Sequence, residues 1–570
     1  MSCDKQPWIL GISASHNGSA CLLKGDQIVV AIQEERLSRF KRARIYGAGP
    51  SLAIDYCLNY AGIDSSELDL VVLCVQGEAQ SELHDVRRDP SLNVLIHKIP
   101  TMVIPHHFGH ALSAFATSGF EESAILVVDG TGSPTADFLP SEQKLINGNF
   151  ANAWETISLY SASRTEVVPL EKHVVERGAW FTMREYTMPL FGSLGGMFSA
   201  VAQQIFDAPM DAGKVMGLAP YGEPHIPASD FFEISAGKFH FKDTVPLQFQ
   251  HNERWPGRAG EYEMLSASVQ AALEVALMYL VEHLRDLSQS ENLCYAGGVA
   301  LNSVANERII RESGFKNVYI IPAAEDSGTA IGAAYYGLWQ LTRCNSQRLL
   351  VDDAFGQTYN STAVSSALNQ TPTLQSVSST NVMADAVDLL CDGKIIGWFE
   401  GGSELGPRAL GHRSILCDPR RSDAKDTLNS RVKMRESFRP FAPAVLVEEA
   451  ENWFEFGNSI AESPFMLRVC PVRAERRDEV PAIVHVDGTG RVQTVARKSN
   501  PRFYDLIRCF YEKTGVPILL NTSFNIMGQP IIETPAEALE CLLNTGLDCC
   551  VFEERIIFKE SSNGRHKSAG

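Results

Sequence analysis

The sequence has no long apolar run and no cysteine framework, and these two absences exclude two classes of protein. No stretch of about 18 apolar residues could cross a bilayer, and no charged stretch followed by an apolar segment marks a secretory signal. The thirteen cysteines form no CxxC pair and lie mostly inside apolar runs. We therefore expect a cytoplasmic protein with reduced, buried cysteines and no membrane partner.

Lysine and arginine form no run long enough to follow a nucleic-acid backbone. The formal net charge is −18, and binding to phosphate backbones depends on clustered cations. The short basic stretch at residues 36–44 is an exception, which could border an anionic ligand, form a solvated face or touch RNA. We expect no nucleic-acid partner.

The length of 570 residues exceeds what one hydrophobic core usually organises, so we expect two large domains. The composition is that of an ordinary globular protein. A region richer in Ser, Thr, Asn and Gln separates two stretches in which strands and helices alternate. The sequence thus predicts an N-terminal domain at 1–345, a linker at 346–380, a C-terminal domain at 381–560 and a disordered tail at 561–570.

Short apolar strands alternate with longer helical patterns and glycine turns, which predicts α/β domains with mixed sheets. Residues 9–14 and 28–33 are expected to form a hairpin with its turn at 24–27. Helices are expected at 51–61 and 263–287, and further strands at 68–75, 124–128, 293–296 and 318–321.

The first motif that carries chemistry is HxxxH, formed by His106 and His110. Four residues apart on a helix, the two imidazoles share one face and can bind one metal ion. Taken alone, the motif fits two core or capping histidines better than a metal site. A zinc peptidase is not indicated, because the glutamate of HExxH is missing.

Two acidic glycine turns strengthen the metal interpretation. An apolar strand ends at Asp129, followed by Gly130, and a second turn with Asp326 leads into a helix. Such turns place backbone N–H groups and a carboxylate beside phosphates and their metal.

Two further glycine-rich features could bind a nucleotide. A strand runs into the pair Gly297-Gly298 ahead of Asn302, and paired glycines let the backbone approach a flat ring or a ribose closely. Upstream, Lys214 and Gly217 lie in another small-residue segment. Helix packing through small residues explains each feature equally well.

His16 lies in a loop of small residues near the N-terminus. A histidine there can act as a general base near neutral pH, or it can be an exposed turn residue.

The second half of the chain contains cations isolated among glycines, prolines and apolar residues, unlike a solvated face. Guanidinium groups and an ammonium in a partly buried pocket suit phosphate oxygens. Structural salt bridges to the abundant acids are the alternative. Candidate ligands for a small anion are Arg408, Lys433, Arg439, Arg491, Asn521 and Thr522, with His412 nearby.

In this order, the motifs HxxxH, DGTG, GKVMGLAPYG, AGGVALN, EDSGTAIG, GPRALGHRS, RVKMRESFRPFAP and LNTSFN resemble the NodU/CmcH family of O-carbamoyltransferases. The resemblance covers residues 9–558. It implies a Kae1-like N-terminal domain of the actin/Hsp70/sugar-kinase type and a YrdC-like C-terminal domain.

By this resemblance four residues would hold a divalent metal, commonly iron(II): His106, His110, Asp129 and Asp326. Two imidazoles and two carboxylates are compatible with Fe, Mn or Zn. ATP would bind at the glycine-rich turns, carbamoyl phosphate at Arg408 and its neighbours, with Arg408 and Lys433 catalytic in its breakdown. His16 would deprotonate the acceptor hydroxyl. The family often has His-Asp here, whereas this chain has His16-Asn17.

The implied reaction begins when carbamoyl phosphate loses phosphate in the C-terminal domain. The carbamate passes to the N-terminal domain and reacts with ATP to give carbamoyl adenylate, and the hydroxyl of a small-molecule natural product displaces AMP. Two alternatives share the domain types: a threonylcarbamoyl tRNA-modifying enzyme and a non-catalytic nucleotide-gated binding protein. No motif in the sequence identifies the acceptor, the metal or the oligomeric state.

Overall fold

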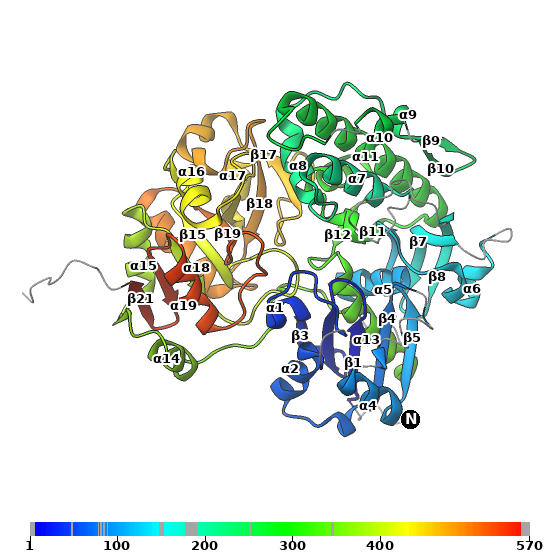
Figure 1. Ribbon diagram of the computed structural model, residues 1–570, viewed down its shortest axis with the longest axis horizontal. Coiled ribbons are helices and arrows are strands. Elements are labelled where there is room, and N and C mark those ends of the chain that lie inside the picture. The colour runs from blue at the N-terminus through cyan, green and yellow to red at the C-terminus, as the bar shows by residue number, and fades with distance from the viewer. Residues whose placement is uncertain are drawn as a thin grey trace, which may run out of the picture.

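The computed structural model describes residues 6–559 apart from 47–49, 78, 80–82, 84–85, 88, 147–152, 177–191, 243, 250–251 and 344–346. The tail predicted at 561–570 lies outside the described residues. Two α/β halves lie side by side, the N-terminal half in blue to green and the C-terminal half in yellow to red (Figure 1). The eleven cysteines in the described part of the chain are all free.

The first sheet of the N-terminal half has the strand order β3-β2-β1-β4-β5. Its first three strands form an antiparallel meander, and β4 and β5 then continue the sheet in parallel. The strands are β1 (Trp8–Ser13), β2 (Ser19–Lys24), β3 (Gln27–Gln33), β4 (Leu70–Val75) and β5 (Thr101–Pro105).

The second sheet repeats this topology as β8-β7-β6-β11-β12. Again three antiparallel strands are followed by two parallel ones. The strands are β6 (Glu122–Val128), β7 (Ala153–Ser163), β8 (Val167–Glu176), β11 (Asn292–Ala296) and β12 (Asn317–Ile320). The N-terminal domain is therefore a structural duplication, in which the turn after β1 corresponds to the turn after β6.

Two helices, α5 (His106–Ser118) and α13 (Thr329–Thr342), pack closely against each other and link the two sheets. Their backbones approach so closely that a Cβ on Gly332 would lie 1.9 Å from the carbonyl oxygen of Gly109. Only glycine fits at such a crossing. This close packing fixes the start of α5 relative to the turn just before α13.

The long helix α11 (Ala259–Ser288) is the one helix among the described residues that is long and apolar enough to cross a membrane. Of its most apolar stretch, 72% is buried inside the protein. Most of its apolar side chains, from Tyr262 to Leu284, belong to the core shared with α12 (Ser303–Glu312) and α7 (Leu194–Phe206). This is the burial expected of a core helix.

The expected N-terminal hairpin is wrong in one respect. A strand, β2, lies between the two predicted strands, so the turn at 24–27 joins β2 to β3. The loop carrying His16 consequently connects β1 to β2. This position matters because it faces the corresponding turn after β6.

The C-terminal half is built on a nine-stranded mixed sheet with the order β13-β21-β20-β14-β15-β19-β16-β18-β17. It has a hydrophobic core of its own, distinct from the core of the N-terminal domain. The strands are β13 (Leu374–Ser378), β14 (Ile396–Phe399), β15 (Arg413–Cys417), β16 (Ala442–Leu446), β17 (Arg468–Pro471), β18 (Thr489–Val495), β19 (Ile518–Ser523), β20 (Cys549–Phe552) and β21 (Arg555–Lys559).

Part of the predicted linker is folded into this domain. The helix α14 (Ser361–Asn369) packs on α19 (Pro535–Asn544), and β13 pairs with β21 at the edge of the sheet. Polar composition suggested a linker there because α14 and β13 lie at the surface, where only one side of each element needs apolar residues.

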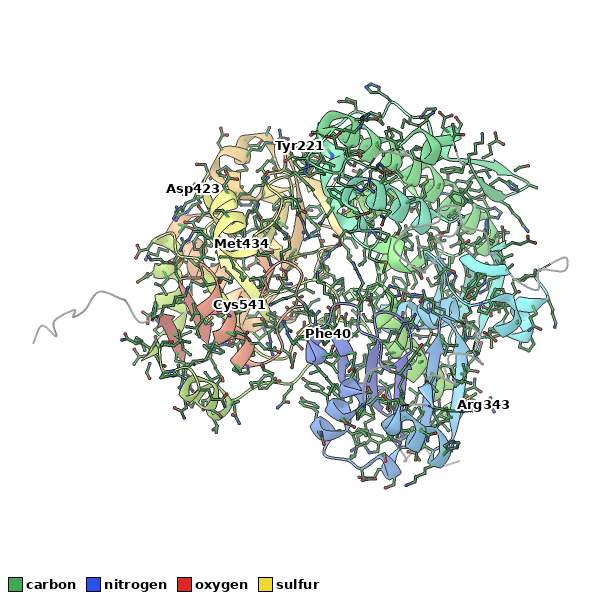
Figure 2. The ribbon with its side chains drawn as sticks, viewed as in Figure 1. Phe40, Tyr221, Arg343, Asp423, Met434 and Cys541 are labelled. Carbon is green, nitrogen blue, oxygen red and sulfur yellow. The ribbon has the colours of Figure 1, made fainter. Side chains whose placement is uncertain are left out.

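The two halves are held together by polar contacts to backbone carbonyls. Arg36 Nη2 donates to Gly406 O at 2.7 Å, and Gln33 Nε2 donates to Leu405 O at 2.6 Å. Arg39 donates to the carbonyl oxygens of Pro530 and Ile531 at 3.0 and 2.8 Å. The basic stretch 36–44 thus serves in part as an inter-domain contact, near Phe40 between the halves (Figure 2).

Candidate functional site

The structure brings the predicted metal-binding residues together at the junction of the two N-terminal sheets. The helix α5 begins directly after β5 at His106, so His106 and His110 project from its first turns on one face. Asp129 follows the last residue of β6, and Asp326 lies in the turn before α13. Three separate elements therefore supply the four side chains.

The ligand atoms of this group converge on one point. His106 Nε2 lies 3.3 Å from both Asp129 Oδ2 and Asp326 Oδ1, and 3.2 Å from His110 Nε2. His110 Nε2 lies 3.7 Å from Asp326 Oδ1 and 4.0 Å from Asp129 Oδ2. All four residues are buried.

This donor set fits a divalent cation. Metal–ligand bonds of about 2.0–2.2 Å place neighbouring ligand atoms roughly 3.0–3.5 Å apart, close to the spacing found. Asp129 Oδ2 is buried and makes no hydrogen bond, so it has an unused lone pair aimed into the group. Imidazole and carboxylate donors suit Fe, Mn or Zn and do not select among them.

The histidines and aspartates of the metal-binding group stabilise each other's charged forms. Burial alone would lower the pKa of His106, but the charge of Asp326 and the adjacent carboxylate of Asp129 raise it well above its ordinary value. Burial opposes ionisation of Asp326, but the charges of His16 and His106 hold its pKa well below the usual range. The site is therefore arranged to keep its carboxylates ionised.

His16 is oriented by Asp326. Its Nδ1 lies 3.0 Å from Asp326 Oδ2 and 3.4 Å from Gln76 Oε1, at the end of β4. The backbone N–H of Asn17 points instead to the hydroxyl of Ser15, 3.4 Å away. The carboxylate that Asn17 lacks is thus provided from another element, and the His16 side chain remains 23% exposed.

The glycines predicted to bind a nucleotide surround Asp129. Gly298 donates its backbone N–H to Asp129 Oδ1 at 3.2 Å, and Gly297 has a φ of +95°. A Cβ on Gly297 would lie 2.2 Å from Val128 O. The carbonyl of Gly130 accepts a hydrogen bond from the hydroxyl of Ser193 at 2.6 Å. Backbone groups therefore line the ends of β6 and β11.

Asn302 has a structural role at this end of β11. Its side chain caps α12 by accepting from Ala305 N at 3.0 Å and exchanges two hydrogen bonds with Gln270 of α11, at 2.8 and 3.2 Å. Its contribution to nucleotide binding stays a prediction.

Lys214 and Gly217 lie apart from the metal-binding group, at the boundary with the C-terminal domain. Both are in α8 (Ala212–Leu218). Lys214 Nζ is 2.9 Å from Asp211 Oδ2 and 2.8 Å from Glu436 Oε1 of the C-terminal domain. The carbonyl of Gly217 lies 3.2 Å from Nε2 of His485, also in the C-terminal domain.

The predicted anion site is a cluster of arginines in which Arg408 and Arg491 have no matching acid. Among the described residues, neither Arg408 nor Arg491 has a carboxylate within salt-bridge distance, and Nε of each is buried without a hydrogen bond. Burial lowers the pKa of Arg491 well below its ordinary value, and the charges of Arg408, Arg435 and Arg439 add to this effect. Burial and the charge of Arg439 likewise lower the pKa of Arg408 to about 10. Buried guanidinium groups without a neutralising carboxylate are suited to bind an anion.

Lys433 reaches the same region through unusual backbone geometry. It ends the π turn η6 (Asn429–Lys433), and Met434 after it has a φ of +47°, in the left-handed region. Lys433 Nζ donates to Ser523 O at 2.8 Å, Asn525 O at 2.9 Å and Asn525 Oδ1 at 2.6 Å. Burial, with help from Arg435, lowers the pKa of Lys433 well below its ordinary value.

The other predicted anion ligands have different surroundings. Asn521 of β19 is buried and donates to Ala409 O at 3.1 Å and Gln493 Oε1 at 2.9 Å. Thr522, next to it on β19, is half-buried, and Arg439 lies 3.7 Å from Glu436. His412 is held by Asp352 at 3.4 Å and by Glu400 O at 3.2 Å, which indicates a structural role.

Sequence reasoning missed three residues of this site. Ser523 and Asn525 contact the ammonium of Lys433, and Arg435 shares the arginine cluster. LNTSFN supplied the signal for Ser523 and Asn525, and RVKMRESFR the signal for Arg435. The sequence did not show which side chains within those motifs would point inward.

The metal-binding group of the N-terminal domain and the arginine cluster of the C-terminal domain lie on either side of the domain boundary. Glu325, beside Asp326, is the carboxylate whose charge acts on Arg408. Glu325 also accepts from Gln33 Nε2 at 3.1 Å, and the same amide group holds the carbonyl of Leu405 at the start of the loop with Arg408. An acidic, histidine-rich site and a basic site are therefore neighbours.

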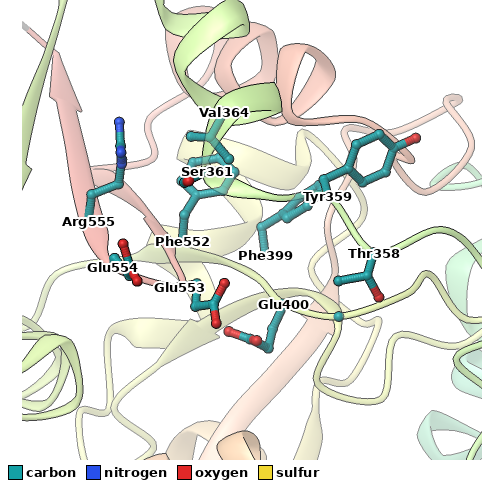
Figure 3. A pocket seen from close by; sticks show the side chains of 11 residues that line it. Thr358, Tyr359, Ser361, Val364, Phe399, Glu400, Phe552, Glu553, Glu554 and Arg555 are labelled. Atoms are coloured by element: carbon teal, nitrogen blue, oxygen red, sulfur yellow. The ribbon is translucent and has the colours of Figure 1, made fainter.

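A small cavity in the C-terminal domain is not part of either group. It lies between Tyr359, Phe399, Glu400 and the β20–β21 turn at Glu553 (Figure 3). Its volume of about 30 Å³ is room for a water molecule, far too little for a nucleotide.

Comparison with known proteins decides the family. The family described as Carbamoyltransferase N-terminus matches residues 8–90 and 75–335, and the one described as Carbamoyltransferase C-terminus matches residues 387–559. The chain belongs to the carbamoyltransferase family. This family makes the chain a transferase of carbamoyl groups and confirms the resemblance found in its motifs.

Several relatives of this carbamoyltransferase come from nodulating bacteria. Nodulation protein NolNO of Sinorhizobium fredii is 35% identical over 96% of this chain and 80% of its own length. Nodulation protein NolO of Bradyrhizobium diazoefficiens is 35% identical over 81% of this chain and 80% of its own. Nodulation protein U of Azorhizobium caulinodans is 27% identical over 93% and 95%.

Solved structures resemble the carbamoyltransferase more remotely. Full-length HypF in a phosphate- and nucleotide-bound form covers 60% of this chain and 56% of its own, with a TM-score of 0.39 and 13% identity. A ROK hexokinase from Thermus thermophilus covers 57% and 97%, with a TM-score of 0.31 and 13% identity.

Proposed function

We propose that this chain is an ATP-dependent O-carbamoyltransferase that modifies a hydroxyl group of a small-molecule natural product. The observation that carries the proposal is the pairing of two unlike sites: an unneutralised arginine cluster in the C-terminal domain beside a histidine–aspartate group in the N-terminal domain. A transferase that used one activated donor alone would need only one of them.

Carbamoyl phosphate binds in the C-terminal domain, with its phosphate oxygens on Arg408, Arg439 and Arg491. Water cleaves the bond between the carbamoyl carbon and the phosphate, giving carbamate and inorganic phosphate. Lys433, whose pKa is lowered by burial, holds the edge of the pocket through Ser523 and Asn525. Asn521 ties the loop of Arg408 to β19 by its bond to Ala409 O.

Carbamate then moves to the N-terminal domain and attacks the α-phosphate of ATP. The new bond gives carbamoyl adenylate, and pyrophosphate leaves. The backbone around Gly130, Gly297 and Gly298 would cradle the nucleotide at the ends of β6 and β11. Because carbamate is unstable in water, it would need an enclosed path between the two sites.

A divalent cation fits the group of His106, His110, Asp129 and Asp326, and iron(II) is our proposal for its identity. When bound, it would supply positive charge beside the phosphates. The acceptor hydroxyl displaces AMP from carbamoyl adenylate. His16 accepts the proton of that hydroxyl at Nε2, because Asp326 holds its Nδ1 at 3.0 Å.

Incubation of the purified protein with ATP, carbamoyl phosphate and iron(II), with each omitted in turn, tests this proposal without an acceptor. Phosphate, pyrophosphate and carbamoyl adenylate are followed by mass spectrometry. We expect adenylate only in the complete mixture and phosphate release from carbamoyl phosphate without ATP. Nucleotide binding with no consumption of carbamoyl phosphate would contradict the proposal and favour a nucleotide-gated binding protein.

A further inference from the structure

Two arginines of the anion site are carried by a segment that packs on the other domain. We call residues 435–440 the docking segment; it includes Arg435 and Arg439 and belongs to the C-terminal domain. Its central residue, Phe438, is only 4% exposed, yet it belongs to the core cluster of the N-terminal domain. The segment is therefore shared between the domains.

Phe438 occupies an aromatic socket formed by Phe206, Tyr221 and Trp255 of the N-terminal domain. Its ring stacks on Phe206 at a centroid distance of 6.0 Å and meets Trp255 edge-on at 5.4 Å and Tyr221 at 6.4 Å. Figure 2 places Tyr221 at the edge of its domain that faces the C-terminal domain. Gly217 lies against the segment because a Cβ there would meet Pro440 at 3.5 Å.

An ion pair holds the segment beside the socket. Glu436 Oε1 is 2.8 Å from Lys214 Nζ, which is also 2.9 Å from Asp211. Glu436 Oε2 lies 3.7 Å from Arg439 Nη1. Glu436 thus connects a cation of the N-terminal domain with an arginine of the anion site.

The segment needs such anchoring, because its arginines enter a region that is already positive. The charges of Arg435 and Arg439 both act on Arg491, and Arg439 acts on Arg408. Like charges in a partly buried region repel strongly. Attachment to the N-terminal domain opposes this repulsion.

We propose that Phe438 and Glu436 are positioning residues, with Lys214 as the docking partner, and that the anion site is complete only when the docking segment rests on the N-terminal domain. The proposal rests on carbamoyl phosphate binding to the arginine cluster, as in the proposed function. It assigns Lys214 to the coupling of the two sites, whereas its sequence motif suggested nucleotide binding.

The test measures anion and nucleotide binding separately in the full-length protein. The variants are Phe438→Ala, Lys214→Met, Glu436→Gln and the double variant Lys214→Met/Glu436→Gln, with Lys214→Arg as the conservative one. Calorimetry gives the Kd of carbamoyl phosphate, of inorganic phosphate and of ATP, and phosphate release gives KM and kcat. Thermal unfolding confirms that each variant folds.

We expect Phe438→Ala, Lys214→Met and Glu436→Gln each to raise the Kd and KM for carbamoyl phosphate about tenfold, with kcat and the Kd of ATP within about twofold of the wild type. The double variant should raise the Kd of carbamoyl phosphate no more than the more strongly affected of its two single variants does. Each single variant already breaks the Lys214–Glu436 ion pair. Lys214→Arg should bind carbamoyl phosphate nearly as the wild type does. Lys242→Met, which breaks a surface pair with Glu233, is the matched control and should change nothing.

Unchanged anion binding in all folded variants would overturn the positioning role. Loss of ATP binding in Lys214→Met, with carbamoyl phosphate binding intact, would also overturn it and make Lys214 a nucleotide ligand. Additive effects in the double variant would contradict coupling through this ion pair. Failure of the wild type itself to bind either anion would instead disprove the anion site and the proposed function.

Discussion

At the residue scale, the sequence predicted which side chains lie together within one helix, but not which side chains from distant elements contact each other. His106 and His110 could be paired because four residues on a helix fix their geometry. The partner of His16 could not be read, because Asp326 reaches it from a turn more than 300 positions away.

A buried charged network under the metal-binding group had no sequence motif at all. Lys172 Nζ lies 2.6 Å from Glu155 Oε2 and 2.7 Å from Glu142 Oε1. Glu155 Oε1 accepts hydrogen bonds from the backbone N–H groups of His107 and Ser133, both at 3.0 Å. Folding of the β7–β8 hairpin brings these residues together, so only the structure reveals the support for the start of α5.

Replacing Lys172 by Met should destabilise the protein by about 3 kcal/mol, because Glu142 and Glu155 would remain buried without their cation. Chemical denaturation measures the free energy of unfolding. The matched control is Lys316→Met, which breaks an exposed pair with Glu291 and should cost less than about 1 kcal/mol. A loss at Lys172 no larger than in this control would contradict a charged network in the core.

Arg408 offers a direct test of the anion site. Replacement by Ala should reduce phosphate release from carbamoyl phosphate about 10- to 100-fold, because hydrogen bonds to a charged group contribute about 1.5–3 kcal/mol each. ATP binding should be unchanged, since the proposed nucleotide site lies in the other domain. Arg497→Ala, at a largely exposed pair with Asp505, is the control. Wild-type phosphate release by Arg408→Ala would remove Arg408 from the site.

At the element scale, apolar runs predicted six strands of the N-terminal domain, which the structure contains as β1, β3, β4, β6, β11 and β12, but not their connections. Residues 9–14 were expected to pair with 28–33, yet Ser19–Lys24 forms β2 between them. The run SACLLK is short and begins with small residues, so it resembled a loop tip. The duplicated strand order of the two N-terminal sheets could not be predicted either. The duplication consists of strand pairings, and the segments that form the two sheets share no obvious sequence repeat.

The turn between β11 and η4 (Gly298–Leu301) depends on Gly297. Gly297→Ala should destabilise the protein by about 1–3 kcal/mol, because alanine is strained at a φ of +95° and its Cβ would lie 2.2 Å from Val128 O. The displaced end of β6 should also weaken ATP binding. Gly260→Ala in the first turn of α11, where the added Cβ meets nothing within 4 Å, should be neutral or slightly stabilising. Denaturation and calorimetry separate the two effects, and equal stability of both variants would contradict the steric argument.

At the scale of the whole molecule, length and composition predicted two domains but gave no sign of the interface between them. The N-terminal core extends across the boundary to include Leu405, Phe438 and Phe465 to Leu467. Sequence composition cannot show this, because an apolar residue in a loop looks the same whether it packs on its own domain or on its neighbour. The interface is what places the two sites side by side.

A buried ion pair across this interface allows its strength to be measured. Arg468 of β17 binds Glu307 of α12 through two contacts, Nε to Oε2 at 2.6 Å and Nη2 to Oε1 at 3.0 Å, and both side chains are buried. Glu307→Gln removes the charge but keeps the shape, which leaves Arg468 buried without a carboxylate, beside the glutamine amide, the carbonyls of Ile460 and Glu462 and the hydroxyl of Ser459.

We expect Glu307→Gln to lower the stability of the interface by about 3 kcal/mol. If the interface couples the two cores, the wild type unfolds in one calorimetric transition and the variant in two, because each domain keeps its own core. Arg308→Ala, on the same helix but in an exposed pair with Glu312, should leave a single transition. Two transitions already present in the wild type would mean that the domains unfold independently, and the closeness of the two sites would then depend on ligand binding instead of on this interface.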